Sequence, residues 1–152
     1  GALFFTILLG IALTDVREYI IPDEFTYGGL AIGLLFALVG GLPTLVPALI
    51  GAVVGFALLW LIGFAGQLIL KEEAMGGGDV KMMAMVGAFV GWQGVLLTIF
   101  LGALLGTVIF LPLSLLGRRK LVPFGVFLSV GAAATWIAGA AIIAWYRAYI
   151  GL

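Results

Sequence analysis

Two aspartates stand beside long apolar stretches and could act together as acid and base. Asp15 follows an apolar run over residues 2–13, and Asp79 follows three glycines and precedes another such run. Partial burial disfavours the charged form of a carboxyl, and a second carboxyl nearby disfavours it further. Two such groups brought together would share a proton, so that one activates water while the other protonates or hydrogen-bonds a carbonyl. We therefore interpret Asp15 and Asp79 as a candidate catalytic pair.

Each aspartate also has a plainer interpretation, which the residues alone leave open. The Gly76–Gly78 run with Asp79 could be a glycine turn followed by a helix N-cap. Asp15 could be a charge at a membrane boundary, paired with Arg17 or Lys81. The remaining acidic residues fit charges in solvated loops: Glu18, Asp23, Glu24, Glu72 and Glu73. Asp23 is also a plausible N-cap for the next helix.

Other kinds of catalytic site are excluded by residue types that the chain lacks. It contains no Cys and no His. Sites built on a Ser-His-Asp triad, a Cys-His pair, Cys-ligated zinc or an HExxH metal motif therefore cannot form from this chain. An enzyme made of this sequence must use carboxylates, Lys or Tyr as acid and base, and we expect no metal and no cofactor.

The composition indicates an integral membrane protein. Of 152 residues, 64% are hydrophobic and 9% are charged, whereas a soluble domain carries about 25% charged residues. The mean hydropathy is +1.34, and the net charge is zero with no basic face that would suit nucleic acid. We expect the lipid bilayer to be the main surrounding of a single domain over residues 1–152.

Breaks in the apolar pattern divide the chain into six segments. Pro22, the Gly40–Pro43 turn, the polar loop 71–78 and the Gly91–Gly94 turn are the clearest breaks. The fourth segment is too short to span comfortably alone. The pattern predicts an all-α fold with about six transmembrane helices, over residues 2–13, 24–39, 45–70, 80–90, 95–116 and 124–146.

The basic residues predict the orientation of these helices. If the chain crosses at each segment, the loops at 15–23, 71–79 and 118–122 share one face, and only Arg147 falls on the other. By the positive-inside rule this face is cytoplasmic, which places both aspartates there at the inner membrane. The six basic residues on this face are Arg17, Lys71, Lys81, Arg118, Arg119 and Lys120. Merging the fourth and fifth segments into one crossing would instead put residues 118–120 on the opposite side from Lys71, which is a weaker pattern.

The start of the chain suggests that a preceding region is missing. Only 14 residues precede Asp15, about 21 Å of helix, against a hydrocarbon core of about 30 Å. The first residue is Gly rather than Met. We expect the chain to be a fragment that lacks the start of its first helix or a whole N-terminal region.

Around both aspartates the sequence resembles the type IV prepilin peptidases, which are intramembrane GxGD aspartyl proteases. Gly76 and Gly78 match the two glycines of GxGD, with Asp79 as its aspartate. The resemblance covers nearly the whole chain. It is carried by residues 15–26 (DVREYIIPDEFT), 76–84 (GGGDVKMMA), 87–92 (GAFVGW) and 123–125 (PFG).

The resemblance implies a function and a set of site residues. Asp15 and Asp79 would be the catalytic aspartates of an endopeptidase. Its substrate would be a type IV prepilin or pseudopilin, whose basic leader is removed at the cytoplasmic face just ahead of a hydrophobic helix. Further residues expected to bind substrate or shape the loops are Gly76, Gly77, Gly78, Lys81 and Pro22.

Bacterial members of this family typically carry an N-terminal region with a four-cysteine zinc site, and many also methylate the new N-terminus. The absence of Cys excludes that zinc site from this chain. We therefore expect the peptidase and regard methyltransferase activity of this chain as doubtful.

Two other functions remain open. Intramembrane carboxylates also mark small transporters and proton-coupled subunits, although here no carboxylate lies within the second, third, fifth or sixth segment beyond its ends. A GxGD protease of the presenilin or signal-peptide-peptidase type would cleave inside the substrate helix, but the Ile21–Pro22–Asp23 sequence matches the prepilin enzymes. The oligomeric state is not predicted.

Overall fold

A computed structural model describes residues 1–71, 75–115 and 123–151 of the chain. These residues form helices joined by short connections, so the all-α expectation is confirmed. There are five helices in the order α1 (Ala2–Glu18), α2 (Asp23–Val39), α3 (Leu42–Leu70), α4 (Gly77–Leu115) and α5 (Phe124–Ile150).

The connection between α1 and α2 forms where proline was expected to stop the helix. Tyr19 ends α1 in the left-handed region, with φ 54°, and its N–H bonds the carbonyl of Asp15 at 3.0 Å. Pro22 has extended backbone and is the residue that caps α2. Asp23 is therefore the first helical residue and not the N-cap, because its side chain points to α4 instead, where it pairs with Lys81.

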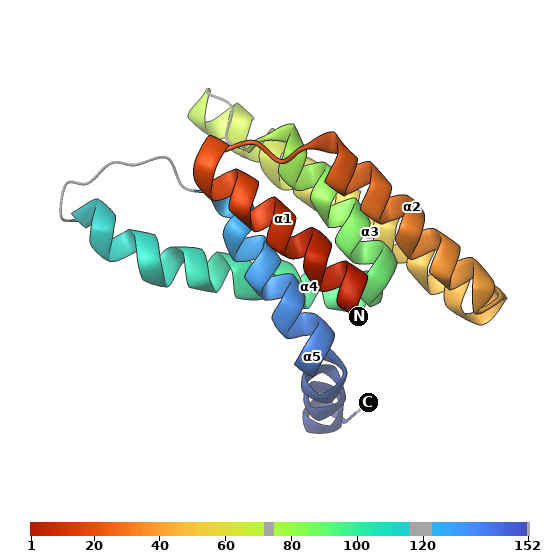
Figure 1. The fold of residues 1–152 in the computed structure, drawn as a ribbon. Coiled ribbons are helices and arrows are strands. Elements are labelled where there is room, and N and C mark those ends of the chain that lie inside the picture. The colour runs from red at the N-terminus through yellow and green to blue at the C-terminus, as the bar shows by residue number, and fades with distance from the viewer. Residues whose placement is uncertain (72–74, 116–122, 152) are drawn as a thin grey trace.

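The expected fourth and fifth segments lie within α4, where two helical stretches meet at a kink, and six transmembrane helices are not confirmed. The only interruption is at Gly91, with φ 70° and ψ 175°, a conformation that glycine adopts without a steric penalty. One residue thus replaces the expected turn over Gly91–Gly94. The two halves of α4 run in different directions on either side of this break (Figure 1).

Within the part of the chain that the structure describes, three helices are long and apolar enough to cross a membrane: α3, α4 and α5. Helices α1 and α2 have 17 residues each. Large apolar side chains cover the outside of the bundle, including Val39 at 88% exposure and Ile69 at 79%. Such an outer surface suits contact with lipid and not with water.

The first half of α4 packs at the centre of the bundle. Met82, Met83 and Met85 are fully buried, so these methionines serve packing. Gly51 of α3 and Gly87 of α4 face each other so closely that a Cβ on either would overlap the backbone of the other. Contacts of this kind between small residues let membrane helices approach each other, and here they place α4 against α3.

The end of α1 and the starts of α4 and α5 lie at the same end of the molecule (Figure 1). Ile21, in the connection after α1, packs against Gly78 at the start of α4 and Gly125 at the start of α5. Segments far apart in the sequence therefore meet where Asp15 and Asp79 are found. Residues 118–122, expected at the same face, lie outside the described residues, as do Glu72 and Glu73.

Candidate functional site

Asp15 lies in the last turn of α1 and is 6% exposed. Its Oδ2 atom accepts a hydrogen bond from the backbone N–H of Val126 at 3.1 Å. Val126 belongs to the first turn of α5, the end of the helix that carries a partial positive charge, and its N–H is shared with the carbonyl of Pro123 at 3.2 Å. A Cβ atom added to Gly125 would lie 2.9 Å from Oδ2, so a larger residue there would require a neighbouring side chain to shift. The start of α5 thus holds Asp15 in place.

Two opposing effects act on the charge of Asp15. Burial raises the pKa of its carboxyl above the usual value, and the backbone N–H groups of Val126 and Gly125 lower that pKa in part. The net direction is upward. Asp15 therefore keeps a proton to a higher pH than a solvated aspartate would.

Asp79 is the third residue of α4 and is 9% exposed. Its backbone N–H bonds the carbonyl of Gly76 at 3.2 Å, which closes the first turn of the helix. Its Oδ1 atom is buried and accepts no hydrogen bond from any described residue. Ile21 contacts both Gly78, the neighbour of Asp79, and Gly125, against which the Asp15 carboxyl packs, so the two aspartates lie in the same part of the molecule. The structure thereby brings together the two aspartates paired from sequence, whose catalytic role remains a prediction.

The three glycines before Asp79 have different surroundings. A Cβ on Gly78 would lie 2.9 Å from the Cβ of Ile21, a branch point that cannot rotate away. A Cβ on Gly76 would lie 3.9 Å from the Asp79 carboxyl, and one on Gly77 would meet nothing within 4 Å. Gly78 is thus the member of the run that close packing requires.

Lys81 and Pro22 both contribute to the connection beside the aspartates. The Lys81 ammonium donates to both carboxylate oxygens of Asp23, at 2.7 and 2.9 Å, and lies 5.2 Å from the centre of the Tyr27 ring. Pro22 starts α2 and so places Asp23 for this ion pair. Both residues therefore fit the loop-shaping part of their predicted role, while a contact with substrate stays a prediction.

Sequence reasoning missed Ile21 and Gly125 as parts of the site. Ile21 is 8% exposed and touches the start of α4 and of α5. Both residues belong to stretches quoted in the resemblance, residues 15–26 and 123–125, which were the available signal. Ile21 and Gly125 contribute to the site through the space that they fill or leave between helices, and residue type alone does not indicate which helices meet.

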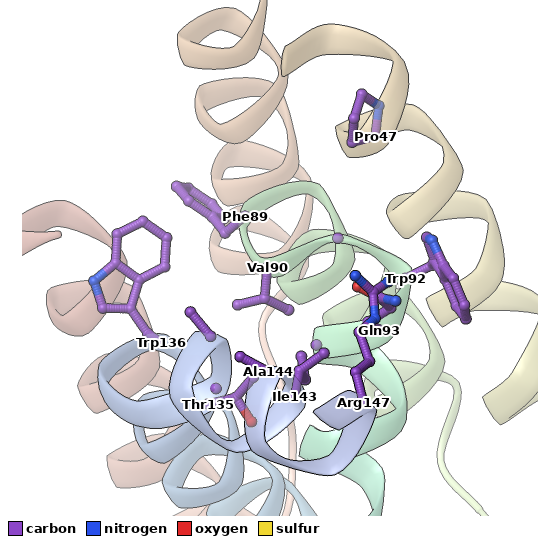
Figure 2. Close-up of a pocket in the computed structure, with 14 residues that line it drawn as sticks. Pro47, Phe89, Val90, Trp92, Gln93, Thr135, Trp136, Ile143, Ala144 and Arg147 are labelled. Atoms are coloured by element: carbon purple, nitrogen blue, oxygen red, sulfur yellow. The ribbon is translucent and has the colours of Figure 1, made fainter. Parts of the chain in front are cut away.

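A large cavity lies elsewhere, around the Gly91 break. Its volume is about 650 Å³, and its lining includes Trp92, Gln93, Trp136 and Arg147 but no acidic residue (Figure 2). Arg147 is 22 residues beyond Gly125 on α5, about 33 Å of helix. The cavity is therefore towards the opposite end of the bundle from the aspartates and offers no carboxyl for acid–base chemistry. Among the described residues, no cluster of three or more His, Cys, Asp or Glu could hold a metal ion.

The chain is thus a helical protein with an apolar outer surface, as in membrane proteins, and with two buried carboxyls at one end of its bundle. Comparison with known proteins gives the family. A model of the type IV leader peptidase family matches residues 2–111, so the chain belongs to this family.

Curated relatives agree with this assignment. The chain is 37% identical over 150 residues to a prepilin leader peptidase/N-methyltransferase of Aeromonas salmonicida (strain A449), covering 95% of this chain and 50% of the relative. It is 38% identical over 146 residues to the protein of that name from Aeromonas hydrophila, covering 92% and 49%. It is also 38% identical over 135 residues to the protein of that name from Stutzerimonas stutzeri, covering 86% of this chain and 45% of the relative. The chain spans about half the length of these relatives, and no solved structure matches it.

Proposed function

We propose that the chain carries the peptidase part of a prepilin leader peptidase and that Asp15 and Asp79 cleave the leader by activating water. The observation that carries this proposal is the presence of two buried carboxyls, from α1 and α4, at the same end of the bundle on either side of Ile21. Membership of the type IV leader peptidase family supports the reaction class.

The chemistry follows from the residues available. With no Cys and no His in the chain, the carboxyl pair is the acid–base group best placed for hydrolysis. A water held between the two carboxyls would lose a proton to one of them and attack the peptide carbonyl, which the other would protonate. No metal is required for this reaction.

The substrate class comes from the relatives, which are named prepilin leader peptidases. We propose that a type IV prepilin or pseudopilin presents its leader to the aspartate end, with its hydrophobic helix beside the bundle in the membrane. Arg17, Lys71 and Lys81 accompany the aspartates in the predicted topology, while Arg147 lies far along α5. By the positive-inside rule, this distribution supports an active site facing the cytoplasm at the inner membrane.

The relatives' names also include N-methyltransferase. Our proposal covers only the peptidase step, because the described residues offer a carboxyl pair suited to hydrolysis, and nothing in that pair assigns a methyl-transfer site.

Cleavage of a prepilin-like peptide by the purified chain in detergent tests the proposal. Asp15→Asn and Asp79→Asn should each abolish product formation, because each removes a group that must gain or lose a proton. Glu18→Gln is the matched control: Glu18 is an exposed carboxylate on the same helix as Asp15, and this change should leave the rate near that of the unsubstituted chain. Substantial cleavage by either Asn variant, with its helix content intact, would refute the pair.

A further inference from the structure

The two carboxyls of the pair have unequal surroundings. Asp15 Oδ2 accepts the Val126 N–H at 3.1 Å, at the N-terminal end of α5. Asp79 Oδ1 is buried and has no hydrogen-bond partner among the described residues. A hydrogen bond donated to a carboxylate favours its charged form. A helix N-terminus lies beside each carboxyl, that of α5 beside Asp15 and that of α4 beside Asp79, so the donated hydrogen bond is what distinguishes them. Burying a charged carboxylate oxygen without a hydrogen-bond donor costs free energy, so a carboxyl in this position favours its protonated, neutral form.

Other charged groups do not alter this comparison. The titratable group that faces Asp15 from another helix is Asp79 itself. From α5, Asp15 meets backbone N–H groups and the small Gly125. Arg17 and Glu18 on α1 are exposed to the surroundings. On the α2–α4 side, Lys81 is held by both oxygens of Asp23. A single proton on the pair is thus best placed on Asp79.

We infer that Asp15 is the ionised member that takes a proton from the attacking water, that Asp79 holds the shared proton and gives it to the substrate carbonyl, and that Gly125 is a positioning residue for Asp15. This inference rests on the proposed function, which leaves the two roles unassigned.

The reaction balances in two steps. In the first, a water proton moves to Asp15, the water oxygen bonds to the carbonyl carbon, and the carbonyl oxygen takes the proton of Asp79. In the second, Asp15 gives its proton to the leaving nitrogen, the carbon–nitrogen bond breaks towards nitrogen, and Asp79 recovers a proton from a hydroxyl of the intermediate. The products are an acid and an amine, and the pair returns to its starting state.

Gly125 matters because of the space it leaves. A Cβ there would lie 2.9 Å from Asp15 Oδ2 and 2.8 Å from Ile21 Cδ1. Approaches this close force a neighbour to move. In Gly125→Ala the Asp15 carboxyl is therefore displaced from the Val126 N–H.

Infrared spectroscopy of the purified chain at neutral pH tests which carboxyl holds the proton. The C=O band of a protonated carboxyl should be present in the unsubstituted chain, persist in Asp15→Asn and vanish in Asp79→Asn. The reverse pattern, no band in the unsubstituted chain, or a band kept in both variants would each overturn the assignment. If instead an Asn variant still cleaves peptide, it is the proposed function that fails.

Kinetics of Gly125→Ala test the positioning role. We expect kcat to fall at least about tenfold with little change in KM, as for a misplaced base. Loss of the N–H bond disfavours the charged form and raises the pKa of Asp15, so the acidic limb of the pH–rate profile should move to higher pH. If the acidic limb of the pH–rate profile did not move, or if only KM changed, Gly125 would not be a positioning residue for Asp15.

Two further variants separate this effect from general crowding. In Gly125→Ala with Ile21→Val, the Cδ1 atom that the new methyl meets is removed, while the contact with Asp15 remains. The double variant should stay slow, and recovery of the rate would show that Ile21 rather than Asp15 was displaced. Gly106→Ala is the control, since its Cβ would lie at an ordinary 3.6 Å from the Phe127 ring, and it should keep both rate and pH profile.

Discussion

Ile21 lies between two glycines that belong to different helices, Gly78 of α4 and Gly125 of α5. Because each glycine adjoins or contacts a candidate catalytic aspartate, the position of this one side chain affects both. The sequence predicted the aspartates and the glycine run, since a carboxyl next to an apolar segment is unusual and easily recognised. The resemblance included Ile21, but the packing role of this side chain could not be predicted, because it depends on which helices meet.

At the same scale, the glycine run should respond unequally to substitution. Gly78→Ala brings a methyl to 2.9 Å from the Ile21 Cβ and should lower stability by about 1–3 kcal/mol and reduce peptide cleavage. Gly77→Ala meets open space and has no positive φ, so its stability should be unchanged or slightly higher. Thermal unfolding in detergent and the peptide assay measure both effects. Equal behaviour of the two variants would contradict the packing described for Gly78.

Helix α4 connects the site to the rest of the bundle. Its first half is fixed against α3 at Gly51 and Gly87, and its direction changes at Gly91. The sequence located both features, as a glycine-rich apolar segment and as a turn. It did not predict that helical structure resumes directly after Gly91, because the sequence Gly-Trp-Gln-Gly suits a turn equally well, and tertiary contacts decide between the two.

Contact between α3 and α4 should depend on the absence of a side chain at Gly87. In Gly87→Ala the new methyl overlaps the backbone of Gly51, which cannot rotate aside, and we expect a loss of about 1–3 kcal/mol in stability. Gly28→Ala on α2 is the matched control, because a methyl there meets nothing within 4 Å. The thermal midpoint of each purified variant measures the difference. A midpoint for Gly87→Ala as high as that of Gly28→Ala would be evidence against this helix contact.

At the scale of the whole molecule, the bundle separates a polar end from an otherwise apolar surface. The aspartates, the Lys81–Asp23 ion pair and the start of α5 lie together, and exposed apolar residues surround the remainder. Composition predicted the apolar surface, and the family resemblance predicted the pair. Six transmembrane helices are not confirmed, because the fourth and fifth segments form the single element α4, which has its kink at the predicted break, Gly91.

Proximity of Asp15 and Asp79 in the membrane is the central claim, and chemical cross-linking measures it most directly. Since the chain contains no cysteine, Asp15→Cys with Asp79→Cys places the only two thiols at the proposed pair. A short bifunctional thiol reagent should join residues 15 and 79 within one chain, as read by mass spectrometry of the digested protein. Asp15→Cys with Arg147→Cys, at opposite ends of the bundle, should give no such product. Failure of the first pair to cross-link, with both thiols reactive to a single-ended reagent, would contradict a shared site.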